Sequence, residues 1–382
     1  MLTELFILYF CTNSFKKPLH HMPFISFSKC RKCLIAILLS MALPYGLFAQ
    51  TDDDDFDPDA FEMADETPIK RFCTNKITNL SPTRLVGISF DYLAGYTMSS
   101  QAAEGLGATE AARYSPYDAS VNRNSGLRLD SNIPLISKNN IIVNLTASYW
   151  ESRYDIEEST VSPGHQIALN HARHPLRTST LGTLIFKPLD EKHFLIFQAE
   201  AALNGNYNFG TIKPDFGLMK YSATAIYGWK YDDNRNFGLG VTRTYRGGRV
   251  LHIPVLLWNR TFNDRWGMEL LLPARGHARY NFSTKSMLMF GYELEGQSYH
   301  VQSAPNSNTT YGFSQMELRK SEIRARVSWD KSLTDFIWFN IQAGVRPMYR
   351  YDLAPKENAD AFISNRMGMP LYFRIGLNLV SP

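Results

Sequence analysis

The chain alternates apolar and polar residues with a period of two from residue 83 almost to its end. Successive side chains of a β-strand point to opposite faces, so this period predicts strands with one apolar face. The alternation recurs in 84–98, 141–149, 195–203, 219–231, 321–329 and 371–379. In the last of these segments the apolar face consists of Leu371, Phe373, Ile375, Leu377 and Leu379. The pattern predicts an all-β protein.

Two features favour a membrane barrel over a soluble β-sandwich, which would also alternate. Many segments run for 11–16 residues, whereas strands of soluble proteins have a mode of about 5–6 and a tilted membrane strand needs roughly 9–11. Short polar connections such as 137–140 and 232–235 also alternate with longer ones such as 155–175 and 352–369. Short turns on one side and long loops on the other are typical of outer-membrane barrels.

The number of strands follows from the spacing of these segments. Fourteen are expected, at 84–98, 122–135, 141–154, 176–187, 193–204, 217–231, 236–246, 249–259, 265–273, 276–283, 286–301, 311–329, 336–350 and 370–380. The two segments that flank Pro273 are the shortest, and twelve strands are the alternative if they are not separate. The predicted fold is therefore a transmembrane antiparallel up-and-down β-barrel of about 14 strands, since bacterial barrels have even strand numbers.

The N-terminus has the composition of a secretory signal peptide. Residues 29–50 read KCRKCLIAILLSMALPYGLFAQ, in which basic residues precede an apolar run of about 15 residues and a small Ala49. The run is shorter than the roughly 20 residues of a membrane-spanning helix. We therefore expect a signal peptide over 1–49, with a superfluous extension before Met22, a leader over 50–80 and the barrel over 81–382. Cleavage after Ala49 would leave Cys73 as the one cysteine, which excludes an intramolecular disulfide.

The leader is strongly acidic. Nine acidic residues and no basic residue lie between Asp52 and Glu66, so this stretch repels itself and is predicted to be disordered in the periplasm. From 67 to 382 the chain has 35 basic and 26 acidic residues. The chain after residue 49 is thus neutral as a whole, and its charge gives no reason to expect a nucleic-acid partner. The acidic leader could serve as a solubilising segment or as a gate that docks on the more basic barrel.

Strand parity predicts which charged residues face the lumen. A basic side chain on the lipid face near the bilayer midplane costs about 2–4 kcal/mol, so charges belong inside. The inward residues are predicted to be Arg128, Arg324, Arg326, Arg346, Arg350, Arg374, Glu200, Glu269, Glu293 and Glu322, together with Asp91, Asp130 and Glu295. They could line a water-filled pore with a mild anion preference, or they could close the lumen as ladders of ion pairs.

Three stretches of the sequence resemble a known family. They are 290–300 (FGYELEGQSYH), 259–267 (NRTFNDRWG) and Leu271-Leu272-Pro273-Ala274. They are similar to a family of uncharacterised outer-membrane β-barrel proteins of Bacteroidetes-type bacteria, over about 83–380. The resemblance implies a barrel in the outer membrane and implies no reaction. The sequence departs from many barrels at its end, which lacks a terminal aromatic residue.

The sequence has little that indicates catalysis. It contains no G-x-S-x-G elbow and no H-E-x-x-H or paired-cysteine metal motif beyond the discarded N-terminus. His165, His171 and His174 share one predicted loop, where a solvated loop is favoured over a metal site. His300 near Glu293 and Glu295 is more consistent with a hydrogen-bond network than with a catalytic pair. We therefore predict no catalytic residues, no metal and no cofactor.

These observations predict a barrel in the cell outer membrane that acts as a channel for small polar or anionic solutes. The alternative is a closed structural or assembly barrel that binds partners through its loops or turns. An outer-membrane hydrolase acting on lipid or glycan is the third hypothesis. Outer-membrane lipids, lipopolysaccharide and the barrel assembly machinery are the expected partners in each case.

Overall fold

The computed structural model describes residues 71–381 except 75, 115, 158–173, 209–217 and 303–314. The described residues belong to one compact unit, Pro68–Pro382. No helix among them is long and apolar enough to cross a membrane.

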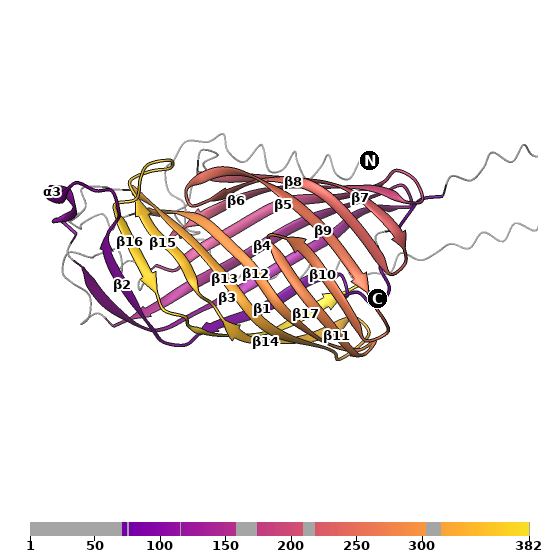
Figure 1. Ribbon diagram of the computed structural model, residues 1–382. Helices are drawn as coiled ribbons and strands as arrows, with labels where there is room; N and C mark the ends of the chain where they lie inside the picture. The colour runs from indigo at the N-terminus through magenta and orange to yellow at the C-terminus, as the bar shows by residue number, and fades with distance from the viewer. Residues whose placement is uncertain are drawn as a thin grey trace, which may run out of the picture. The chain divides into compact units, whose positions relative to one another are not determined.

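Strands make up nearly all of this unit (Figure 1). They are β1 (Arg84–Leu93), β2 (Tyr96–Ala102), β3 (Tyr117–Lys138), β4 (Ile141–Ile156), β5 (Leu176–Pro188), β6 (His193–Gly205), β7 (Met219–Asp232), β8 (Arg235–Arg246), β9 (Arg249–Thr261), β10 (Trp266–Leu272), β11 (Arg275–Ser283), β12 (Ser286–Gln302), β13 (Gln315–Ser332), β14 (Ile337–Val345), β15 (Met348–Ala354), β16 (Ile363–Met367) and β17 (Leu371–Val380). One short helix, α3 (Ala108–Ala111), lies in the connection between β2 and β3.

The strands close into an antiparallel barrel. Consecutive strands pair from β3 to β14, β14 pairs with β17, and β1 pairs with both β17 and β3. The ring therefore has fourteen strands, as predicted. Residues on either side of Pro273 form two separate strands, β10 and β11, which pair with each other. The twelve-strand alternative is wrong for this reason.

Three of the fourteen strands are interrupted, which is why seventeen segments make a ring of fourteen. β1 continues as β2, β14 as β15, and β16 as β17. The break between β1 and β2 does not shift the register: Leu93 pairs with Asn124 on β3, and Tyr96 pairs with Val121, three residues further along both strands. Pro347 and Pro370 lie in two of the breaks, and proline has no N–H to donate to a ladder.

The interrupted strands correct two predicted loops. The stretch 99–121, left between the predicted strands 84–98 and 122–135, was expected to be a loop, but β2 extends to Ala102 and β3 begins at Tyr117. The stretch 352–369 was also expected to be a loop, yet it contains the end of β15 and the whole of β16. β16 has the sequence ISNRM, which does not read as a strand in isolation. It forms one because it pairs with β2 and β15 on its two sides.

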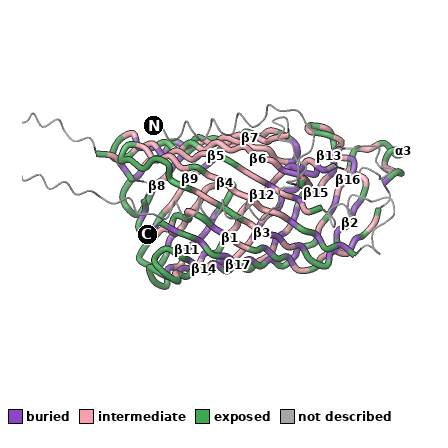
Figure 2. The backbone as a smooth tube through the Cα atoms, turned by 180° about the vertical axis from the view of Figure 1, so that it is seen from behind, coloured by how far each residue is buried: buried purple, intermediate pink, exposed green. Residues whose placement is uncertain are grey.

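The end of the barrel with the long connections contains an apolar core, which we call the apolar ring core. A smaller ring surrounds it, made of β2, β3, β4, β5, β6, β12, β13, β15 and β16. This ring closes because His300 of β12 forms a parallel bridge with Gly205 of β6. Its core contains Leu93, Met98, Val121, Tyr154, Leu176, Tyr299, Leu318, Met348, Leu353 and Ile363, among others. Figure 2 shows this concentration of buried residues around β13, β15 and β16.

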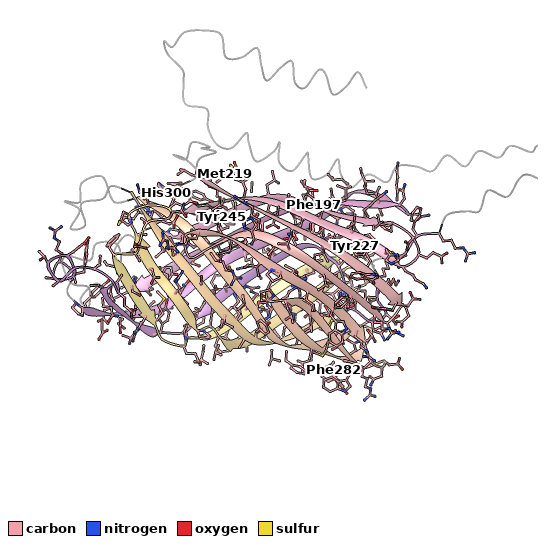
Figure 3. The ribbon with its side chains drawn as sticks, turned by 45° about the horizontal axis from the view of Figure 1, so that its top comes forward. Phe197, Met219, Tyr227, Tyr245, Phe282 and His300 are labelled. Carbon is pink, nitrogen blue, oxygen red and sulfur yellow. The ribbon has the colours of Figure 1, made fainter. Side chains whose placement is uncertain are left out.

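The outer face of the barrel is apolar. Along β17 the residues alternate strictly between exposed and buried, and the exposed ones are Leu371, Phe373, Ile375, Leu377 and Leu379. Exposed apolar side chains also occur on β1, β6, β8 and β13, as with Phe197 of β6. Figure 3 shows Phe197 and Tyr227 on this outer surface. Such exposure over whole strands is unfavourable in water and suits a lipid surrounding.

Candidate functional site: the lumen and its closures

A segment before the first strand lies across the end of the barrel with the short turns. We call residues 71–83 the N-terminal strap. The Cys73 amide donates to the Asp190 carbonyl between β5 and β6 (2.9 Å), and the Thr78 amide donates to the Asp233 carbonyl between β7 and β8 (2.7 Å). Further on, the Ser81 hydroxyl donates to the Glu269 carboxylate on β10 (2.7 Å).

The strap has to cross the lumen. Ser81 contacts β10, whereas Arg84 is already in β1, which pairs with β17 and β3 on the other side of the ring. The buried Cys73 packs against Phe186 and Phe194 inside the barrel. Residues 71–80 were predicted to belong to a disordered leader. Outside residue 75 the structure instead places them against the turns, because their backbone and side chains find partners there.

A belt of buried charges fills the lumen above the strap. Ten side chains form this charged belt, namely Asp91, Arg128, Glu293, Glu295, Lys320, Glu322, Arg324, Arg326, Arg346 and Arg374. Six are basic and four are acidic, so the belt carries an excess of positive charge. The belt comes from neighbouring strands of one wall, namely β12, β13, β17, β1 and β3, and from Arg346 in the break after β14.

The ion pairs of the belt join neighbouring strands. Arg374 on β17 donates two hydrogen bonds to the Asp91 carboxylate on β1, of 2.5 and 2.8 Å. Arg128 on β3 donates to both oxygens of Glu295 on β12, at 3.1 and 3.2 Å. The Arg128 guanidinium also lies 4.6 Å from the ring centre of Trp150. Bidentate and stacked arginines of this kind hold a fixed geometry.

The centre of the belt is β13. Arg326 donates to Glu293 (2.5 Å) and to Gln342 (2.5 Å). Glu322, 1% exposed, accepts hydrogen bonds from Arg346, with the Nε bond at 2.6 Å. Arg324 on the same strand forms ion pairs with Glu295 and with Glu322. Every belt carboxylate therefore already has a basic partner.

The remaining predicted residues lie elsewhere. Glu269 binds the strap and lies 3.6 Å from Arg279. Glu200 lines a cavity between β6 and β12 and accepts a hydrogen bond from Gln198. Arg350 is a correction: its side chain is 47% exposed and pairs with Asp352, on the face opposite the buried Tyr351 and Leu353.

The error at Arg350 has a simple cause. Glu322 pairs with Met348, but the next residue of β13, Ser321, pairs with Arg350. One extra residue on β15 forms a bulge, and a bulge reverses the parity of everything that follows it. Parity counted from β14 therefore assigns Arg350 to the wrong face.

Two cavities lie on either side of the belt. The turn-end cavity, of about 400 Å³, is bounded by strap residues 80–83 and includes Arg84, Glu269, His277, Glu293 and Arg326. The side cavity, of about 260 Å³, lies between β4–β8 and β12 and includes Trp150, Glu200, Lys220, Arg246 and Glu295. Sequence parity did not single out His277 or Lys320, because a lone histidine or lysine on a strand carries no pattern of its own.

Two groups of histidines were considered in the sequence, and neither was favoured as a metal or catalytic site. His165 and His171 lie outside the described residues. His300 has the opposite parity from Glu293 and Glu295 on β12, so the three do not face one another along this strand. Across the described part of the chain, no group of three or more His, Cys, Asp or Glu residues is placed to hold a metal ion.

Two groups at the turn end, outside the spanning strands, have shifted pKa values. Burial raises the pKa of the Cys73 thiol above its usual value, which a nearby Lys230 partly opposes. Hydrogen bonds from the Lys192 amide and the His193 ring and amide lower the pKa of Asp190 to about 2. The Asp190 carboxylate thereby stabilises the β5–β6 turn to which the strap is bound.

The chain belongs to a family of barrels whose role is unassigned. A profile of the domain of unknown function DUF6268 matches residues 119–380, more than half of the chain. The match begins in β3 and ends at the last residue of β17, so it leaves out the strap, β1 and β2. None of the curated protein sequences compared with the chain resembles it significantly.

Solved structures with a similar arrangement are outer-membrane proteins. The toluene transporter TodX of P. putida has 6% identity and a TM-score of 0.33, with 79% of this chain and 91% of TodX covered. A FadL homologue of Pseudomonas aeruginosa has 9% identity and a TM-score of 0.36, with coverages of 78% and 90%. The NanC porin has 10% identity and a TM-score of 0.30, with coverages of 75% and 100%. At these values the similarities do not bear on the function of this chain.

Proposed function

We propose that this protein is an outer-membrane channel for small polar solutes, with a preference for anions, and that the N-terminal strap closes its turn end. The observation that carries the proposal is a polar lumen inside a barrel whose outer face is apolar. The lumen holds two cavities separated by the charged belt. A protein that needed only a stable barrel would gain more from an apolar interior, because buried ion pairs barely offset their desolvation.

The outer membrane is the location that fits this surface. The exposed apolar side chains follow whole strands, and the sheet closes into a ring of fourteen strands. The signal peptide expected over 1–49 would deliver the chain to the periplasm, from which outer-membrane barrels are inserted.

The solute route we propose leaves the barrel beside β12. The apolar ring core blocks an exit along the barrel axis at the loop end. The β10–β11 hairpin is short, and its pairing with β12 ends where Arg275 pairs with Glu293. Above that point β12 pairs with β13 and touches β6 only at His300, within the described residues. The side cavity lies along this unpaired edge of β12 and provides the outlet.

The anion preference rests on the charges of the lumen. The belt has six basic and four acidic side chains, and rings of arginine and lysine favour anions in pores. We expect the reversal potential in a tenfold salt gradient to have the sign of an anion-selective pore. Replacement of Arg326 by glutamine should reduce this selectivity, and Arg265→Gln in the exposed β9–β10 turn is the matched control.

Single-channel conductance of three refolded chains tests the closure. The chains begin at residue 50, at residue 68, which lacks the acidic stretch 52–66, and at residue 83, which also lacks strap residues 71–82. We expect rare openings from the first two and frequent, salt-dependent openings from the third. If the chain beginning at 68 already opens frequently, the leader is the gate and the strap is not. If none of the three chains conducts although all are shown to be folded, the result supports the closed structural barrel instead.

A reversible disulfide bond between the strap and the β7–β8 turn gives a second test of the closure. The Thr78 amide and the Asp233 carbonyl are 2.7 Å apart, so cysteines at these two positions are adjacent. In a Cys73→Ser background, oxidation of the Thr78→Cys/Asp233→Cys pair should abolish openings, and reduction should restore them. The Thr78→Cys single variant is the control and should not respond. Equal conductance of the oxidised and reduced pair would show that the strap does not gate the lumen.

A further inference from the structure

The turn-end cavity has two buried nitrogen atoms without hydrogen-bond partners, and both are donors when His277 carries its proton on Nε2. The Nε2 atom of His277, a residue only 5% exposed, has no hydrogen-bond partner, and neither does the buried Nε of Arg326. Both residues line this cavity of about 400 Å³. The nearest carboxylate oxygen to His277 Nε2 belongs to Glu293, at 3.7 Å, which is too long for a hydrogen bond.

The two carboxylates of the same cavity already have hydrogen-bond donors. Glu293 accepts from Arg326 at 2.5 Å and lies 3.9 Å from Arg324. Glu269 accepts from the amide and the hydroxyl of Ser81, at 3.1 and 2.7 Å. A buried donor without an acceptor is unfavourable, so the cavity is complementary to a ligand that brings acceptors and a negative charge.

A further basic side chain lies at the edge of the cavity. Arg275 begins β11 at the tip of the β10–β11 hairpin and has the same parity as His277. Among the described residues no hydrogen bond or ion pair is found for its side chain. Arg84, by contrast, also borders the cavity but is engaged with Asp330 at 3.2 Å. Arg275 is therefore an available guanidinium on the same inner surface as the two buried donors.

We propose that the turn-end cavity is a binding site for a small oxyanion, a carboxylate or a phosphate, held by His277, Arg326 and Arg275. The site rests on the proposed function, for which it would define the class of solute. Its volume is in the range of about 300–1,000 Å³ that is usual for small-molecule sites. Strap residues 80–83 border it, so a bound anion is covered from the turn end until the strap moves.

Calorimetric titration of the folded protein in detergent tests the site without any need for conduction. The probes are sodium phosphate and sodium acetate, in a background of constant ionic strength, with glucose as a neutral control. We expect one of the two anions to bind at one site per chain and glucose not to bind. Absence of binding for both anions would overturn the proposal. The anion that binds identifies which of the two oxyanion classes the site takes.

Three variants locate the binding. Loss of a hydrogen bond to a charged partner corresponds to a decrease in affinity of about tenfold to a hundredfold. We expect this loss for Arg275→Gln, which lies at an exposed hairpin tip and leaves the packing intact, and for His277→Ala. His277→Gln keeps an N–H donor and should recover part of the affinity. Arg265→Gln, on the exposed β9–β10 turn, should bind like the unmodified chain, and equal affinities for all four variants would place the anion elsewhere.

The two proposals can fail independently. Anion binding in detergent without any conductance of the strap-deleted chain would refute the channel and keep the site. Conductance without saturable binding of phosphate or acetate would refute the site and keep the channel.

Discussion

The apolar ring core and the charged belt lie in the same barrel, but one buries apolar side chains and the other buries charged ones. Strand β13 contributes to both: Met316 and Leu318 face the ring core, and Glu322 and Arg324, a few residues on, face the belt. All four side chains are nearly inaccessible. The opposite face of the strand changes as well: the charged Glu317 and Arg319 alternate with the ring-core residues, whereas apolar residues such as Val327 alternate with the belt residues. On the inner face, the ring core contributes stability and the charged belt contributes the polar surface on which the proposed function depends.

The difference is one of energetics. Burial of a leucine side chain contributes about 1.5–3 kcal/mol, whereas a buried ion pair is close to neutral against an apolar pair of the same volume. The ring core should therefore supply stability at the loop end. The belt is tolerated because each carboxylate has a basic partner, and it supplies polarity where a solute would pass. The predictions below test this division, from the largest expected effect to the smallest.

Breaking the ion pair between β1 and β17 should have the largest effect. Arg374→Leu removes both hydrogen bonds that Asp91 accepts from arginine and leaves Arg128, at 4.0 Å, as its ion-pair partner. It should lower the free energy of unfolding by about 3–5 kcal/mol. The double variant Asp91→Leu/Arg374→Leu should lose much less, because no unpaired charge remains. Urea unfolding in lipid vesicles, followed by tryptophan fluorescence, measures both. Equal losses would mean that the pair itself, and not the orphaned charge, matters.

Truncation in the ring core should come next. Leu318 is fully buried, and Leu318→Ala should lower the free energy of unfolding by about 2–5 kcal/mol through lost burial and a residual cavity. Leu377→Ala, on the lipid face at 44% exposure, is the matched control and should lose less, because lipid fills the space. A larger loss at Leu377 would contradict a stabilising core at the loop end.

The rate at which a thiol reagent modifies Cys73 measures directly whether the strap stays in place. The thiol is 7% exposed and its pKa is raised by burial, so little thiolate is available to react. A maleimide should label it on the order of ten times more slowly than the exposed position of a Thr74→Cys variant in a Cys73→Ser background. The chain in denaturant provides the reference rate. Similar rates at the two positions in the folded protein would show that the strap does not stay in place.

The smallest effect concerns pH. The pKa of Asp190 is lowered to about 2, so its stabilising effect is fully present above the ordinary carboxyl pKa of about 4 and is lost as the pH falls toward 2. Asp190→Asn should therefore be less stable than the unmodified chain at pH 6 and nearly equal to it near pH 2. Thermal unfolding across this range checks the convergence. A difference that grows on acidification would have the wrong sign.

The sequence by itself determined the class of fold and the number of strands. The period of two assigns each residue to a face, and polar turns at regular spacing separate fourteen segments; neither depends on distant parts of the chain. The same parity placed nearly all of the charged residues on the inner face, from Arg128 on β3 to Arg374 on β17. It did not reveal which carboxylate pairs with which arginine, since partners such as Asp91 and Arg374 are brought together only when the barrel closes.

The tertiary structure decided the rest. Polar segments such as β16 became strands because neighbouring strands offered unpaired backbone groups. A single extra residue in β15 turned Arg350 away from the inner face, and no local signal marks a bulge of this kind. The strap is held by turns that lie far along the sequence, and the small ring closes where β12 meets β6. Local periodicity determines to which face a side chain points. Only the closed barrel determines which other residues that side chain contacts.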